Sequence, residues 1–71
     1  MKEVVKIWFE RLYKEEIENI EGTISNERLW KKGSKDEEEV VIHTLNIEEL
    51  EEYLGLLKEK LHEVEKIKPE D

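Results

Sequence analysis

Apolar side chains recur at every third or fourth position between residues 40 and 64. Read in sevens, the first and fourth positions of this stretch are aliphatic apart from one histidine. They are Val40, His43, Ile47, Leu50, Leu54, Leu57, Leu61 and Val64. This unbroken alternation of three and four is typical of an amphipathic helix with a coiled-coil-like seam. The pattern therefore predicts a helix that packs along another helix, although it specifies no chemistry.

A first helix is predicted from about residue 3 to residue 32. Its apolar residues keep helical spacing on both sides of Gly22. An internal glycine costs about 1 kcal/mol relative to alanine, which a long packed helix tolerates. A break at Gly22, followed by a loop, is the alternative interpretation. Lys31 and Lys32 suit the negative end of a helix, and Gly33 suits the left-handed residue just past it.

The apolar face of this first helix is widest near its start. Residues 4 to 9 are apolar apart from Lys6. All of the helix's apolar residues except Ile7 fall in an arc of roughly 220°, whereas an ordinary surface helix needs about 100°. One neighbouring helix cannot cover so wide a surface. We therefore expect this end of the molecule to meet a second chain.

The second helix is predicted over about residues 35 to 66. Ser34 and Glu37, three residues apart, form a capping box at its start, and acidic residues fill the first turn. Pro69 ends the helical pattern.

The run over residues 39 to 45 allows a different interpretation. It is rich in β-branched residues, as a strand would be, and the helix would then begin later, at Asn46. The heptad phase favours the helix, because Val40 and His43 are in register with Ile47.

Two such helices, over about residues 3–32 and 35–66, form an all-α, antiparallel two-helix hairpin. Residues 1–71 are then a single domain, and residues 67–71 are a frayed C-terminal tail. Because a hairpin leaves part of both apolar faces wet, we expect a homodimeric four-helix bundle or a higher oligomer. Gly55 is expected to give room for Trp8. The predicted pairs are Ile24 with His43, Ile20 with Ile47, Ile17 with Leu50, Tyr13 with Leu54, Leu12 with Gly55, and Val5 with His62.

Size and composition strengthen the expectation of self-association. A chain of 71 residues without cysteine has no disulfide to reinforce its small core. With only two histidines and no cysteine it also lacks the ligands of a structural zinc site, so no metal is expected. The net charge of −8 argues against nucleic acid and against an anionic membrane surface as partners. With no apolar run near 20 residues and no signal peptide, we expect a cytoplasmic protein.

His43 is the one polar residue of the seam. It is a candidate ligand contact, pH switch or metal ligand. The plainer interpretation is a buried histidine that is hydrogen-bonded to Glu27 or to its symmetry mate and sets the helix register. His62 lies about 28 Å away along the helix, so the two histidines of one chain cannot share a metal ion. We expect His62 to be a surface or interface residue.

The predicted turn carries the only basic, aromatic-bearing segment of an acidic chain. Its members are Arg28, Trp30, Lys31, Lys32, Ser34 and Lys35. An anionic small ligand such as a nucleotide would suit them. The alternative is that the lysines cap the helix while Trp30 packs on Val40.

A further candidate surface near the turn is apolar. Val41, Ile42 and Leu45 lie off the heptad seam and, with Leu29, form a patch of the kind that marks an interface. The candidate binding residues are therefore Arg28, Trp30, Lys32, Ile42, His43 and Leu45.

The sequence contains no pattern typical of catalysis. There is no phosphate-binding glycine loop and no nucleophile motif. A single Glu-x-x-His match at Glu59 and His62 resembles a carboxylate metal site, but Glu59 falls on an outward heptad position. We expect no enzyme activity and no cofactor.

Part of the chain resembles small uncharacterised proteins of phages and prophages from low-GC Gram-positive bacteria. The resemblance covers about residues 17 to 61. It is carried by the segment 26 to 30, Gly33-Ser34 with the acidic turn after it, His43, Asn46 and the Glu-Glu-Tyr-Leu stretch at 51 to 54. The resemblance implies a phage origin and a host-cell setting, and it implies no activity.

The expected function is that of a non-enzymatic small binding or regulatory protein. It would be phage-encoded and would bind a host or defence-system protein. The alternative is an oligomer that sequesters a small anionic, nucleotide-like ligand near the hairpin tip. An acidic DNA mimic is a third possibility, but the glutamates are spread round both helices.

Overall fold

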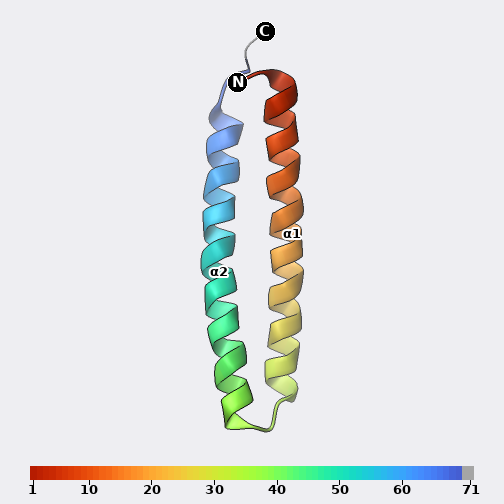
Figure 1. The fold of residues 1–71 in the computed structure, drawn as a ribbon, viewed down its shortest axis with the longest axis vertical. Helices are drawn as coiled ribbons and strands as arrows, with labels where there is room; N and C mark the ends of the chain where they lie inside the picture. Colours follow the sequence, from red (N-terminus) through yellow and green to blue (C-terminus); the bar gives the residue numbers. More distant parts are fainter. Residues whose placement is uncertain (70–71) are drawn as a thin grey trace.

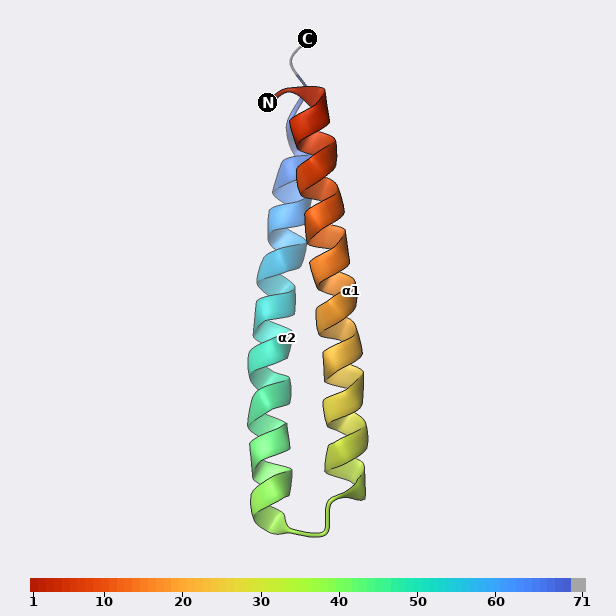
Figure 2. The same cartoon turned by 45° about the vertical axis from the view of Figure 1, so that its right-hand side comes forward.

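The computed structural model describes residues 1 to 69. Helix α1 (Glu3–Gly33) and helix α2 (Glu37–Lys66) lie antiparallel and side by side along their whole length (Figures 1 and 2). The Cα atoms span 57 × 14 × 10 Å. The predicted all-α hairpin is confirmed, and residues 39 to 45 are helical, so the strand interpretation is wrong.

Helix α1 continues through Gly22 without a break. A Cβ atom built at Gly22 would meet no atom within 4 Å, so no close packing contact requires a glycine at this position. The helix tolerates it because the residues on either side, Ile20 and Ile24, keep their places against α2. The alternative of a loop after Gly22 is therefore wrong.

The turn differs from the prediction in its capping chemistry. Gly33 is the last residue of α1 and has no positive φ, so the expected left-handed residue is absent. Ser34 does not cap α2. Its hydroxyl donates to the carbonyl oxygen of Trp30 at 2.9 Å, and Asp36 is the N-cap of α2. The predicted capping box at Ser34 is wrong because the Ser34 hydroxyl donates to a carbonyl group at the end of α1 instead.

The cap at Asp36 should contribute measurably to stability. Its carboxylate accepts a hydrogen bond from the backbone N–H of Glu38 at 3.0 Å. Asp36→Ala is expected to lower the free energy of unfolding by about 1 kcal/mol, the usual cost of losing an N-cap. Urea unfolding followed by circular dichroism measures this change. The neighbouring Lys35→Ala is the control, and an equal loss in both variants would contradict the capping role.

The heptad seam predicted for α2 is the packed surface of that helix. None of its eight positions is exposed. The buried aliphatic residues are Ile17 and Ile24 of α1 and Ile47, Leu57 and Val64 of α2. No described side chain is fully buried. The hairpin therefore has a thin core, as expected for two layers of helix with solvent on both sides.

The two helices pair about one helical turn away from the predicted register. Val5 was expected opposite His62, whereas the ammonium group of Lys6 donates to the carbonyl oxygen of Glu65 at 3.1 Å. The shift follows from the later start of α2. Gly55 faces open space instead of α1, so the expected niche for Trp8 is absent.

The tail begins with Ile67, whose backbone N–H donates to the carbonyl oxygen of Val64 at 3.1 Å and closes α2. Residues 67 to 69 follow outside the helix. The predicted frayed tail covers residues 67 to 71, of which 70 and 71 lie outside the described residues.

Candidate functional site

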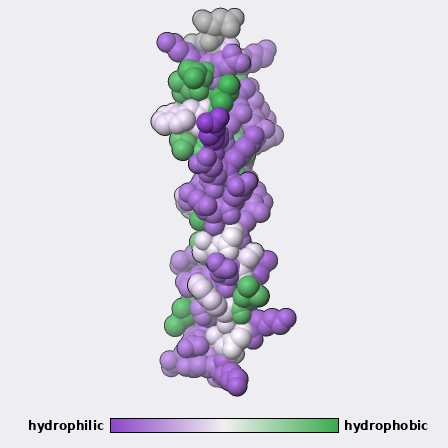
Figure 3. Space-filling view, turned by 90° about the vertical axis from the view of Figure 1, so that its right-hand side faces the viewer, coloured by the Kyte–Doolittle hydropathy of each residue, from purple (hydrophilic) through white to green (hydrophobic). Residues whose placement is uncertain are grey.

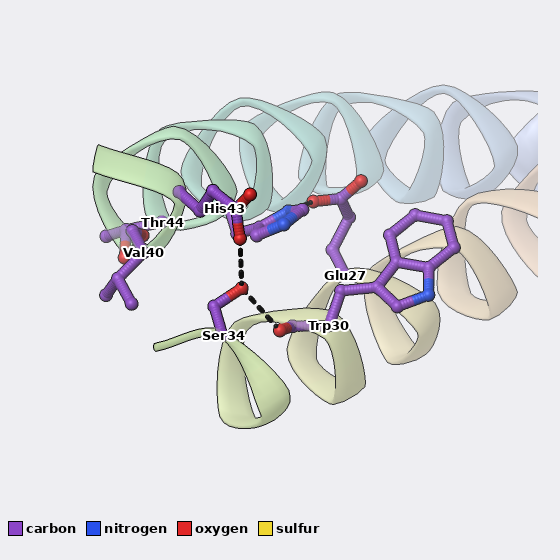
Figure 4. A network of polar contacts seen from close by, with 7 residues as sticks. Glu27, Trp30, Ser34, Val40, His43 and Thr44 are labelled. Atoms are coloured by element: carbon purple, nitrogen blue, oxygen red, sulfur yellow. Dashed lines mark hydrogen bonds and ion pairs between the residues drawn. The ribbon is translucent and has the colours of Figure 1, made fainter. Parts of the chain in front are cut away.

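The hairpin tip is held together by hydrogen bonds that join both helices. The hydroxyl of Ser34 donates to the Trp30 carbonyl oxygen and lies 3.2 Å from Oε2 of Glu39 in the first turn of α2. On α2, the hydroxyl of Thr44 donates to the carbonyl oxygen of Val40 at 2.7 Å. These contacts fix where α1 ends and α2 begins, and so position the side chains around them (Figure 4).

His43 is held by a carboxylate from the other helix. Its Nδ1 lies 2.6 Å from Oε2 of Glu27, and both side chains are largely shielded from water. Figure 4 shows the imidazole pointing from α2 toward the Glu27 side chain on α1. Since the carboxylate accepts, the ring donates through Nδ1. The prediction that Glu27 is the partner of His43 is confirmed, and no buried side-chain polar atom of the described residues lacks a partner.

The ring of Trp30 lies beside this pair. The centroids of the Trp30 and His43 rings are 6.1 Å apart with an interplanar angle of 46°. More than half of the Trp30 surface remains exposed. The predicted packing of Trp30 on Val40 is thus replaced by a tilted contact with His43, which leaves one side of the indole free.

An open hollow of about 650 Å³ lies next to Trp30. Its apolar wall is formed by Leu29, Trp30 and Ile42, and its polar wall by His43 and by the residues of the turn. The residues around the turn are Gly33 at the end of α1, Ser34 and Lys35 in the loop, and Glu39 in the first turn of α2. A bound group would therefore meet an aromatic ring and aliphatic side chains, with one lysine and one glutamate at the rim.

The structure brings together only part of the predicted site. Trp30, Ile42 and His43 line the hollow. Arg28 lies on another side of the hairpin, where Nη2 contacts Oε1 of Glu51 at 2.6 Å. Lys32 is exposed and does not line the hollow.

Five lining residues were absent from the predicted binding set. Leu29 had been placed only in the apolar patch, and Gly33 and Glu39 had been assigned to the helix ends. Ser34 and Lys35 are the other two. The signal for Glu39 is its position five residues after Ser34, within reach of the serine hydroxyl across a short turn.

Leu45 belongs to a second surface, on the outer side of α2. Val41 and Leu45 are more than half exposed. On the same side of α2, at helical spacing, lie the exposed residues Glu48, Glu52 and Glu59. Leu29 and Ile42 of the predicted apolar patch line the hollow, whereas Val41 and Leu45 lie on this outer surface of α2. Ile42 borders both, because it also lines a shallow hollow with Val41.

Apolar side chains are also exposed at the opposite end of α1. They are Val4, Ile7, Trp8 and Leu12. Figure 3 shows the α1 side of the molecule, with hydrophobic side chains gathered toward the two ends and hydrophilic ones between them. The width of the apolar face near the start of α1, inferred from the sequence, thus appears as surface exposed in the single chain.

The described residues contain no group of three or more histidine, cysteine or acidic side chains arranged to hold a metal ion. None of the described helices is long and apolar enough to span a membrane. Comparison with known proteins found no matching family model, no matching curated protein and no matching solved structure.

Proposed function

We propose that this chain is a small, non-enzymatic binding protein that self-associates, as a homodimeric four-helix bundle or a higher oligomer, and attaches to a protein of its host cell. On the resemblance described above, it is encoded by a phage or prophage and acts in the host cytoplasm on a host or defence-system protein. The observation that carries the proposal is the outer surface of α2, where Val41 and Leu45 are exposed beside a row of glutamates.

This outer surface indicates the chemistry of the foreign partner. Exposed aliphatic residues contribute to association when a partner covers them, and flanking carboxylates favour a basic partner. The chain's net charge of −8 adds long-range attraction for a basic surface, and that attraction weakens with salt. A basic helix or loop with a few aliphatic side chains fits these requirements.

The second candidate, an oligomer that sequesters an anionic ligand, has less support. The three residues chosen for charge or stacking, Arg28, Trp30 and Lys32, do not converge on one hollow. Arg28 is engaged by Glu51. Lys35 is the one cation lining the hollow beside Trp30, and Glu39 lines it too.

Capture of a partner from host lysate tests the proposal. Leu45→Ala is expected to lower capture of a specific protein at least about fivefold, since it removes an exposed contact without touching the core. Ile7→Ala is the matched control, because Ile7 is an equally exposed aliphatic residue outside the outer surface of α2. Raising the salt concentration should weaken capture further. Capture that is unchanged by Leu45→Ala and by salt would contradict the proposal.

A further inference from the structure

One long face of the hairpin combines both tryptophans with very few charges. We name it the tryptophan face. Both helices contribute to this face, because Trp30 of α1 and Ile42 of α2 line the same hollow. Asn46 and Tyr53 of α2 line the next hollow, and the other members follow at helical spacing. Its residues are Trp8, Leu12, Glu16, Asn19, Thr23, Asn26 and Trp30 of α1, and Ile42, Asn46, Glu49, Tyr53, Leu56 and Lys60 of α2.

Charge distinguishes this face from the rest of the surface. Its only charged residues are Glu16, Glu49 and Lys60, although charged residues make up 45% of the chain. The opposite face carries the ion pair of Arg28 with Glu51. Two copies of a chain with net charge −8 repel each other over most of their surface. The tryptophan face is where a second copy approaches with the least repulsion.

The hairpin exposes more area than a compact monomer of its mass, and its broad side is large enough for a standard interface. A compact monomer of 8.6 kDa would expose about 4,700 Å². The hairpin exposes 5798 Å², roughly 1,100 Å² more than that scaling predicts. The broad side of the molecule measures 57 by 14 Å between Cα atoms, roughly 800 Å², which is the area that each partner buries in a standard interface.

From these observations we infer that a second copy of this chain docks on the tryptophan face in antiparallel orientation, with its Trp8 in the tip hollow formed by Leu29, Trp30 and Ile42. The inference rests on the proposed self-association and adds the face and the orientation. Trp8 and Trp30 lie 22 residues apart on one helix, about 33 Å. A two-fold axis midway between them brings each Trp8 to the Trp30 of the other copy, so both hollows are filled by one operation.

The tip of the hairpin carries charges of both signs. Lys31 and Lys32 lie in the last turn of α1, and Glu37, Glu38 and Glu39 lie in the first turn of α2. The antiparallel orientation therefore rests on the positions of Trp8 and Trp30.

The first experiment tests the face. Light scattering of the full chain at about 50 μM is expected to give about 17 kDa, twice the monomer mass. Leu12→Glu places a carboxylate on the tryptophan face and is expected to raise the dimer dissociation constant at least about tenfold. Ile7→Glu makes the same change on the opposite side of α1 and is expected to leave the mass unchanged. Helicity by circular dichroism checks that both variants fold.

The second experiment tests the orientation, and it uses the absence of cysteine from the natural chain. Asn19 lies midway between Trp8 and Trp30, so an antiparallel dimer places it beside its own copy. Asn19→Cys is expected to form a disulfide-linked dimer on mild oxidation, while Ser25→Cys, which lines a hollow on the opposite face, remains unlinked.

The outcomes are separable. A monomeric wild-type chain overturns the proposed self-association, and the inference falls with it. A dimer that survives Leu12→Glu but not Ile7→Glu overturns the choice of face alone. If Leu12→Glu lowers the solution mass but Asn19→Cys forms no disulfide-linked dimer, the antiparallel orientation is overturned.

Discussion

Replacing Leu57 with alanine is expected to lower the free energy of unfolding by about 2 to 4 kcal/mol, the usual cost of emptying a buried leucine site. Leu57 is 8% exposed and is the sixth of the eight seam positions. The hairpin has only a handful of buried aliphatic residues, so one cavity removes a large part of the packing between the helices. Chemical unfolding followed by circular dichroism gives the value.

The control for this prediction is Leu45→Ala. Leu45 is a leucine of the same helix but is 54% exposed. Its replacement is expected to change the free energy of unfolding by less than about 0.5 kcal/mol. If both variants lost the same stability, the face of α2 that packs against α1 would be wrongly assigned.

Replacing His43 with leucine is expected to cost about 2 kcal/mol, because it leaves the Glu27 carboxylate shielded from water and without its partner. Glu27 is 9% exposed, and its Oε2 lies 2.6 Å from Nδ1 of His43. Replacing both residues with leucine removes the polar pair together. The double variant is therefore expected to be more stable than the His43→Leu single variant, because it leaves no unpaired carboxylate between the helices.

A double-mutant cycle measures this coupling from four unfolding curves: the wild type, His43→Leu, Glu27→Leu and the double variant. An interaction energy of about 1 kcal/mol or more is expected, because the two residues are in direct contact. Additive losses would show that the pair contributes nothing specific to the register of the hairpin.

The pattern of apolar residues was sufficient to predict the helices and their packed seam. Spacing alone placed Val40 and His43 on the same face as Ile47, and that reasoning favoured a helix over a strand at residues 39 to 45. It also gave Glu27 as one of two candidate partners of His43. These features depend on helical periodicity, which the sequence displays over many turns.

The turn was harder to predict because two residues compete to cap α2. Ser34 and Asp36 both have side chains that cap helices well. The choice depends on where α1 ends, since the last carbonyl groups of α1 also attract the Ser34 hydroxyl. That small difference delays the start of α2 and moves the pairing by about one turn along the hairpin.

The candidate binding cluster was divided because neighbours in sequence are not neighbours on a helix. Arg28 and Trp30 are two residues apart, which turns them about 200° from each other. Arg28 accordingly contacts Glu51 on one side while Trp30 lies against His43 on the other. A basic and aromatic run within a helix therefore indicates a shared site only when its members are three or four residues apart.

We propose above all that the hairpin is completed by a second copy. The most direct test is the midpoint of thermal unfolding measured at protein concentrations from about 1 to 100 μM. If unfolding is coupled to dissociation, the midpoint rises with concentration, because mass action favours the assembled state. We predict such a rise. A midpoint that is the same at every concentration, together with a solution mass of 8.6 kDa, would contradict the claim.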